Sequence, residues 1–271
     1  MVDELSDTIP RSGRQSNAGS TPTRSRMDNS SNALKAMPLN VVHLWAAPLE
    51  IAAAEREALA QTLSVEELDR ASRFHFEVHR NRYIAAHGWL RLVLGYYLSL
   101  APAQLLFEHS PRGKPALSGP NELQFNMAHS EDLALIGVGR TLQLGVDLEF
   151  VRSLSDMEEL VARFFSKRES AAFRLLPEGQ KARAFFNLWT RKEAWLKATG
   201  EGITHLLDQV EVSFLPGERA CLLQLPAAYA AGAAWCLYDI AVRPGFAAAL
   251  AVPGPIVPQL RWTSELIGVG L

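Results

Sequence analysis

Helical and strand-like spacings of apolar residues alternate along the chain. A β-branched and aromatic run at 40–45 predicts a first strand. The capping sequence Ser64-Val65-Glu66-Glu67 starts a region of helical spacing that runs to residue 94, with a break near 76–80. After Pro102 the spacing predicts short strands at 105–108, 123–126, 133–138 and 142–149. The remainder predicts helices at 156–165, 167–176 and 183–199, then strands at 210–214, 234–242 and 246–252.

This order predicts an α+β fold, because long helices run into short strands twice. We expect a duplication of two similar α+β halves with a junction near residue 140. The N-terminal half would span 38–140 and the C-terminal half 141–256. Residues 1–37 are rich in Ser, Asn and Arg and too polar to order, so we expect a disordered tail there. We expect a second tail at 257–271.

Composition narrows the class of protein. Of 271 residues, 48% are apolar and 21% charged, with a net charge of −2, which indicates a globular chain and disfavours a nucleic-acid binder. The N-terminal segment has no apolar run, so we expect neither a signal peptide nor a membrane span. Cys221 and Cys236 lack the spacing of a zinc site or a disulfide framework. We therefore expect a cytoplasmic protein. We also expect it to be a monomer.

Two carboxylates are candidates for metal chemistry. In the strand GVDLEF, Asp147 and Glu149 stand at i and i+2, so they share one face while Val146 and Leu148 face the core. At about 5 Å and an effective dielectric near 20, their repulsion is about 3 kcal/mol. A hard cation such as Mg²⁺ would offset that repulsion. The alternative is a solvated strand end with two exposed acids.

A second candidate pair lies on the helix around 189–197. Trp189, Glu193 and Lys197 stand at i, i+4 and i+8, so they share one face. An ordinary surface ion pair would have the same Glu-to-Lys spacing. The surrounding tryptophans favour a buried helix, in which charged groups need partners.

Basic and polar residues elsewhere are candidates for binding phosphate. Arg112 and Lys114 lie in the turn PRGKP, where Gly113 permits a positive φ. His129 and Ser130 end the strand FNMAHS, and Arg70 belongs to a basic stretch. The alternatives are a solvated basic turn, a hydrogen-bonded structural His–Ser pair and a solvent-exposed helix face. The chain has no HExxH, GxSxG or GxGxxG motif, which disfavours zinc proteases, α/β-hydrolases and Rossmann enzymes.

Taken in order, five motifs resemble those of the 4′-phosphopantetheinyl transferases, specifically the larger single-chain type that activates peptide synthetases and related carrier proteins. They cover about residues 64–205 and are RGKPAL, FNMAHS, GVDLEF, RFFSKRES and LWTRKEAWLKATGEGI. The resemblance implies a pseudo-dimeric α+β fold with coenzyme A bound between the halves. One departure is Ala128, where many members of the family have Ser.

The resemblance also implies roles for individual residues. It makes Asp147, Glu149 and Glu193 ligands of Mg²⁺ and places Lys197 on the phosphate, where it would assist the leaving group. It places further basic residues against coenzyme A, namely Arg70, Arg112, Lys114, His129 and Lys192. Glu149, Glu193 and water bound to the metal all remain candidates for the general base.

The implied reaction moves 4′-phosphopantetheine from coenzyme A to a serine of an acyl or peptidyl carrier protein and releases adenosine 3′,5′-bisphosphate. Two alternatives use the same residues. One is a different Mg²⁺-dependent phosphotransferase, and the other is a non-catalytic protein that binds coenzyme A or a carrier protein.

Overall fold

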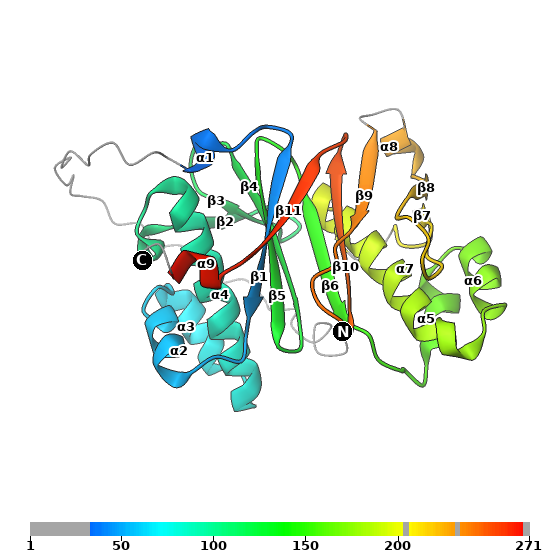
Figure 1. Ribbon diagram of the computed structural model, residues 1–271, viewed down its shortest axis with the longest axis horizontal. Coiled ribbons are helices and arrows are strands. Elements are labelled where there is room, and N and C mark those ends of the chain that lie inside the picture. Colours follow the sequence, from blue (N-terminus) through cyan, green and yellow to red (C-terminus); the bar gives the residue numbers. More distant parts are fainter. Residues whose placement is uncertain (1–32, 203–205, 231–233, 268–271) are drawn as a thin grey trace. The chain divides into compact units, whose positions relative to one another are not determined.

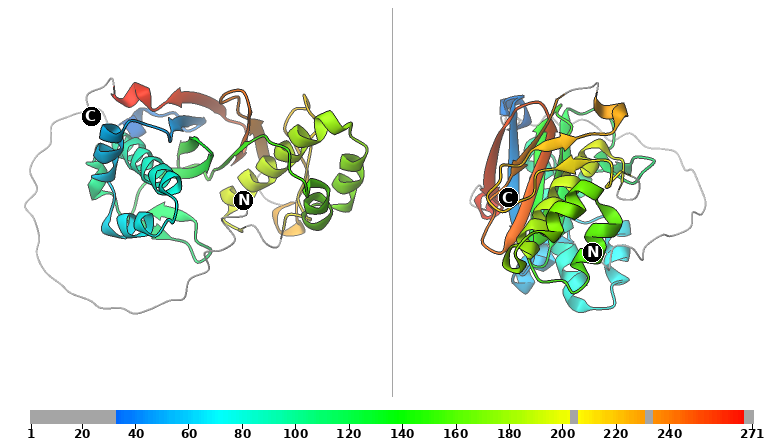
Figure 2. Two further views of the ribbon diagram at one scale, coloured as in Figure 1. Left: turned by 90° about the horizontal axis from the view of Figure 1, so that it is seen from below. Right: turned by 90° about the vertical axis from the view of Figure 1, so that its right-hand side faces the viewer.

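The computed structural model describes residues 33–202, 206–230 and 234–267. These residues form four layers, in which two sheets lie face to face and helices cover the outer face of each (Figure 1). The view from below in Figure 2 shows the same layers edge on, with the sheets between the two helical groups. The α+β class predicted from the sequence is confirmed, whereas the duplication of two halves stays a prediction.

The first sheet has four strands in the order β11-β1-β5-β4. Strand β1 pairs antiparallel with β5, which pairs antiparallel with β4, while β11 runs parallel to β1. The short helix η2 (Pro102–Gln104) leads into a separate hairpin of β2 (Phe107–His109) and β3 (Pro115–Leu117). The strands of the first sheet are β1 (Val41–Pro48), β4 (Leu123–Ser130), β5 (Leu133–Arg140) and β11 (Val257–Trp262).

Helices of the N-terminal part bury their apolar faces on the first sheet. Helix α4 supplies Trp89, Val93 and Tyr97 to a cluster that includes Trp45 of β1 and Ile136 of β5. The predicted start at Ser64 is confirmed, because Ser64 and Glu67 form a reciprocal capping box. The helices are α1 (Ala33–Ala36), α2 (Ala53–Ala60), α3 (Val65–Ser72) and α4 (Glu77–Leu98).

The second sheet is antiparallel, in the order β6-β10-β9, and its two faces differ. One face packs Val146, Leu148 and Leu250 against Leu44 and Leu135 of the first sheet. On the other side, α7 contacts β6 and β10. The strands are β6 (Gly145–Phe150), β9 (Trp235–Asp239) and β10 (Phe246–Pro253).

The other elements of the C-terminal part surround α7 (Glu178–Thr199), which is five residues longer at its start than predicted. Within the described ranges, no helix is long and apolar enough to cross a membrane. Cys221 and Cys236 are free thiols. The surrounding elements are α5 (Met157–Phe164), α6 (Lys167–Arg174), β7 (Glu211–Val212), β8 (Leu222–Gln224) and α8 (Ala227–Ala230). Helix α9 (Ser264–Ile267) instead follows β11 and lies beside α4 (Figure 1).

Both predicted tails need correction. The prediction for 257–271 was wrong for residues 257–267, which contain β11 and α9. Strand β11 pairs along one side with β1, and Leu266 is buried in the first core. At the other end, α1 lies inside the predicted tail of 1–37, with Leu34 and Met37 buried. Residues 1–32 and 268–271 lie outside the described residues. Elements α1, β11 and α9 are too short for their apolar residues to show a period in the sequence.

Strand β6 approaches α7 so closely that only glycine fits at Gly145. A Cβ added there would lie 2.2 Å from the Ala194 carbonyl oxygen and 2.2 Å from the Ala198 nitrogen. These are backbone atoms of the helix, so no side-chain rotation relieves the clash. The contact brings the face of β6 that carries Asp147 next to the face of α7 that carries Lys197.

We expect Gly145→Ala to lower the free energy of unfolding by about 3 kcal/mol or more, because helix and strand must separate. Gly179→Ala is the matched control: Gly179 lies in α7 with open space around its Cβ position. That change should be neutral or stabilise by about 0.5–1 kcal/mol. Urea denaturation measures both, and equal effects of the two substitutions would contradict the close approach.

Candidate active site

The predicted carboxylates lie at the contact between β6 and α7. Asp147 is 4% exposed, and its Oδ1 accepts a hydrogen bond from Lys197 Nζ at 2.7 Å. Glu193 lies one helical turn before Lys197 and is also buried. The structure therefore brings Asp147 and Lys197 into contact, whereas the strand and helix periods predicted only which residues share a face within each element.

Glu149 is held in an unfavourable electrostatic environment. Burial, followed by the negative charge of Asp147, raises the pKa of Glu149 from 4.5 to about 7. A hydrogen bond from Ser130 opposes this shift, with Ser130 Oγ 2.9 Å from Glu149 Oε2. The pair of carboxylates thus favours a nearby positive charge, and Lys197 supplies one beside Asp147.

Asn126 and Ser130 attach β4 to β6, although the two strands belong to different sheets. Asn126 Oδ1 accepts from the Val146 N–H at 2.8 Å, and Ser130 Oγ accepts from the Phe150 N–H at 3.0 Å. From the sequence, Ser130 was named only as a candidate for binding an anion, and Asn126 was given no role. The signal was present in FNMAHS, because Asn126, Ala128 and Ser130 alternate onto one face of the strand.

The turn predicted at PRGKP is confirmed, with Gly113 at φ +86°. Lys114 Nζ donates to the carbonyl oxygens of Ala198 at 2.8 Å and Leu144 at 3.2 Å, and burial lowers the pKa of Lys114 to about 8. Lys114 thus links this turn to the end of α7 and the segment before β6. Arg112 is ion-paired with Glu201, just after α7.

His129 and Arg70 lie on the N-terminal part of the chain. His129 is exposed near the end of β4, next to Ser130. Arg70 is exposed on α3, and its guanidinium lies over the ring of Tyr83, 5.9 Å from the centroid. Their predicted roles toward coenzyme A stay predictions.

Lys192 was predicted to contact phosphate, but the structure places it in the protein interior. Its side chain is 0% exposed, and its Nζ lies 2.5 Å from Glu169 Oε2 and 2.6 Å from the Leu207 carbonyl oxygen. Glu169 also accepts from the backbone N–H groups of Ser166 and Val212. The interpretation of Lys192 as a ligand of coenzyme A was therefore wrong in this structure, because Glu169 and a carbonyl group already hold its ammonium.

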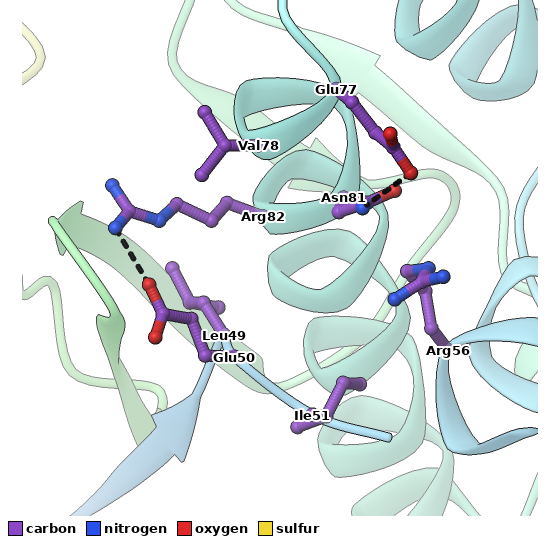
Figure 3. A pocket seen from close by; sticks show the side chains of 8 residues that line it. All are labelled: Leu49, Glu50, Ile51, Arg56, Glu77, Val78, Asn81 and Arg82. Carbon is purple, nitrogen blue, oxygen red and sulfur yellow. Dashed lines mark hydrogen bonds and ion pairs between the residues drawn. The ribbon is translucent and has the colours of Figure 1, made fainter. Parts of the chain in front are cut away.

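In the described part of the chain, no group of three or more His, Cys, Asp or Glu residues is arranged to hold a metal ion. Asp147 and Glu149 interact electrostatically, and Glu193 lies on α7, the helix that packs on their strand. A surface pocket of about 380 Å³ lies elsewhere, lined by residues of the 49–56 and 77–82 segments (Figure 3). It contains none of the predicted metal ligands.

We expect Glu149→Gln to stabilise the protein at pH 8 in metal-free buffer. The raised pKa means that the folded state favours protonated Glu149, so the carboxylate costs stability as pH rises from 4.5 to about 7. The gain should be on the order of 1–3 kcal/mol at pH 8 and vanish near pH 4.5. Urea denaturation at both pH values tests it; a variant no more stable than wild type at pH 8 contradicts the shift.

We expect Lys192→Met to destabilise the fold by about 3–5 kcal/mol, because Glu169 would remain buried without its cation. Lys167→Met is the control, since Lys167 is exposed at the start of α6. Chemical denaturation of both variants, with coenzyme A affinity measured alongside, separates the two roles. Unchanged stability together with weaker coenzyme A binding would restore the phosphate role.

Comparison with known proteins agrees with this arrangement. The family model of the 4′-phosphopantetheinyl transferase superfamily matches residues 143–251, which include β6, α7 and β10. The chain is 44% identical over 216 residues to the 4′-phosphopantetheinyl transferase HetI of Nostoc sp., covering 79% of this chain and 88% of the relative. It is 24% identical over 206 residues to the 4′-phosphopantetheinyl transferase Sfp of Bacillus subtilis, covering 76% and 88%. The chain therefore belongs to the 4′-phosphopantetheinyl transferase family.

Proposed function

We propose that the protein transfers the 4′-phosphopantetheine group of coenzyme A to a serine hydroxyl of an acyl or peptidyl carrier protein. The observation that carries this proposal is the contact of Asp147 on β6 with Lys197 on α7, with Glu149 on the same strand face. This contact places acidic oxygens and an ammonium group together at the junction of two secondary-structure elements. Such a site suits a reaction in which phosphate charge must be neutralised.

The reaction forms one bond to phosphorus and breaks one. The serine oxygen attacks the phosphorus that bears the pantetheine arm, and the bond from that phosphorus to the oxygen of adenosine 3′,5′-bisphosphate breaks. The electron pair of that bond leaves with the bisphosphate, where Lys197 offsets the growing negative charge. The candidates for accepting the serine proton are Glu149, Glu193 and a water molecule that a bound metal would hold.

The donor set fits a magnesium ion. Asp147 and Glu149 offer oxygen ligands from one face of a strand, and their mutual repulsion favours a cation between them. Glu193 lies on the helix that packs on this strand and would be the third protein ligand. When bound, Mg²⁺ would neutralise phosphate oxygens and orient the pyrophosphate of coenzyme A.

The basic residues would hold the rest of coenzyme A. Arg112 and Lys114 lie where the hairpin turn meets the end of α7, and Arg70 and His129 lie on the N-terminal part of the chain. Lys114 already links the hairpin turn to the end of α7 and to Leu144 through carbonyl groups, so we propose that it shapes the site. We propose that Arg112 leaves Glu201 and pairs with a phosphate group of the substrate instead. Lys192 has no place in this set.

Incubation with an apo carrier protein, coenzyme A and Mg²⁺, read by intact mass spectrometry, tests the function. We expect a mass gain on the carrier that matches one phosphopantetheine group. No gain across fatty-acid, polyketide and peptide carriers would refute the proposal. Gain of a phosphoryl group from ATP instead would favour a different phosphotransferase.

We expect Asp147→Asn and Glu193→Gln to reduce transfer to background while the fold is retained. Lys197→Met should lower kcat by about 100- to 1,000-fold, because one positive charge at the phosphate is lost. Glu158→Gln is the control, since Glu158 is an exposed acid on α5. Circular dichroism checks folding, and full activity of either acid variant would remove that residue from the site.

A further inference from the structure

A tight turn controls the position of Ser130, the hydrogen-bond donor to Glu149. The turn consists of Glu131 and Asp132, which connect β4 to β5 directly after Ser130. Ser130 Oγ lies 2.9 Å from Glu149 Oε2 and 3.0 Å from the Phe150 nitrogen. A hydroxyl group on a short side chain keeps both contacts only if its backbone is fixed, so the turn must be held in place.

Arg243 holds this turn from the C-terminal part of the chain. It lies between β9 and β10, and its Nη2 donates to Asp132 Oδ1, 111 residues away in sequence. This ion pair lowers the pKa of Asp132, which is therefore ionised at neutral pH. The two side chains are 36% and 32% exposed, so solvent only partly screens the pair.

The same guanidinium also contacts the strand that neighbours Glu149. Arg243 lies over the ring of Phe246, 4.7 Å from its centroid. Phe246 pairs with Phe150 across β10 and β6, and their ring centroids are 5.3 Å apart. Arg243 thus contacts the turn that follows Ser130, through Asp132. It also contacts Phe246, which packs on Phe150 next to Glu149.

The N-terminal part holds the turn from the other side. Arg82 of α4 donates to Glu131 at 3.1 Å and to Glu50 at 2.9 Å, the latter drawn in Figure 3. The Leu49 N–H donates to the Asp132 carbonyl oxygen at 2.8 Å. Glu131 has φ 51°, a left-handed conformation that is unfavourable for a residue with a side chain. These contacts indicate a turn kept in one conformation by both parts of the chain.

We propose that Arg243 is a positioning residue of the active site, which through Asp132 keeps Ser130 on Glu149 and so keeps the metal-binding carboxylate in place. Arg243 makes no contact with substrate in this role. The proposal rests on the proposed function in one respect: the carboxylate that it positions is the one expected to bind Mg²⁺.

The first test measures the Mg²⁺ requirement of phosphopantetheine transfer in Arg243→Met. We expect the Mg²⁺ concentration for half-maximal activity to rise roughly tenfold, as is typical when a supporting contact of a metal ligand is lost. The kcat at saturating Mg²⁺ should stay within about twofold of wild type, because the ligands themselves remain. The matched control is Arg140→Met, which breaks the Arg140–Glu122 ion pair at the opposite end of the β4–β5 hairpin.

Charge exchange provides the rescue. The double variant Asp132→Arg with Arg243→Asp keeps an ion pair in reversed order, and it should recover most of the lost Mg²⁺ affinity. A shift in Arg243→Met no larger than in Arg140→Met would overturn the proposal. So would a double variant that is no better than Arg243→Met alone.

A second measurement does not depend on activity. In metal-free buffer, the destabilisation caused by Ser130→Ala and by Arg243→Met should be non-additive, because both changes loosen one contact. Ser130→Ala and Arg140→Met should be additive. If transfer proves independent of Mg²⁺, the proposed metal site fails, while this cycle still decides whether Arg243 positions Ser130. Additive effects of Ser130→Ala and Arg243→Met would show that it does not.

Discussion

The close contact between β6 and α7 is the constraint on which the site depends. Gly145 lets the strand backbone approach the backbone of the helix at Ala194 and Ala198. Asp147 lies two strand positions after Gly145, and Lys197 lies directly before Ala198, so this close approach brings the two side chains into contact. A larger residue at 145 would separate the acidic face of the strand from the basic face of the helix. The chemistry of the site is therefore a consequence of backbone packing.

The contact between the two sheets has a different character. Its centre is apolar, with Leu44 and Leu135 against Val146 and Leu148. Its edge beside β6 is polar, because Asn126 and Ser130 of β4 accept hydrogen bonds from backbone N–H groups of β6. Apolar contact holds the layers together, and these polar contacts fix how β4 lies along β6.

Two positively charged side chains, Lys114 and Arg243, stabilise the contact between β4 and β6. Lys114 donates to carbonyl groups of α7 and of the segment before β6, and Arg243 pairs with Asp132 beside Ser130. Between them lie Asp147 and Glu149, for which burial and mutual repulsion make a cation favourable. The arrangement keeps two like charges together in the folded protein, at a cost that a bound cation would remove.

Much of the fold could be predicted from apolar spacing, because most long elements bury one face. The capping box at Ser64 and the alternation in GVDLEF were sufficient for α3 and β6. The strand β11 was missed, since its residues 257–262 alternate weakly at the edge of a sheet and depend on pairing with distant β1.

Within the site, periodicity predicted that Asp147 and Glu149 share a face, as do Glu193 and Lys197. It could not predict that β6 and α7 would meet, because that depends on tertiary packing at Gly145. Lys192 was predicted to belong to the site, but it does not. The family resemblance implied a phosphate contact for Lys192, but a helix turns each successive side chain by about 100°, so Lys192 lies on another face than Glu193. Lys192 therefore points to Glu169 in the interior.

Binding of Mn²⁺, a paramagnetic substitute for Mg²⁺, tests the central claim most directly. Electron paramagnetic resonance titration in the presence of coenzyme A counts the bound ions and gives their affinity. The account predicts one site in the wild-type protein, tighter with coenzyme A than without it, and loss of that site in Glu149→Gln. Wild-type affinity in Glu149→Gln would contradict the account, because the metal would then lie elsewhere.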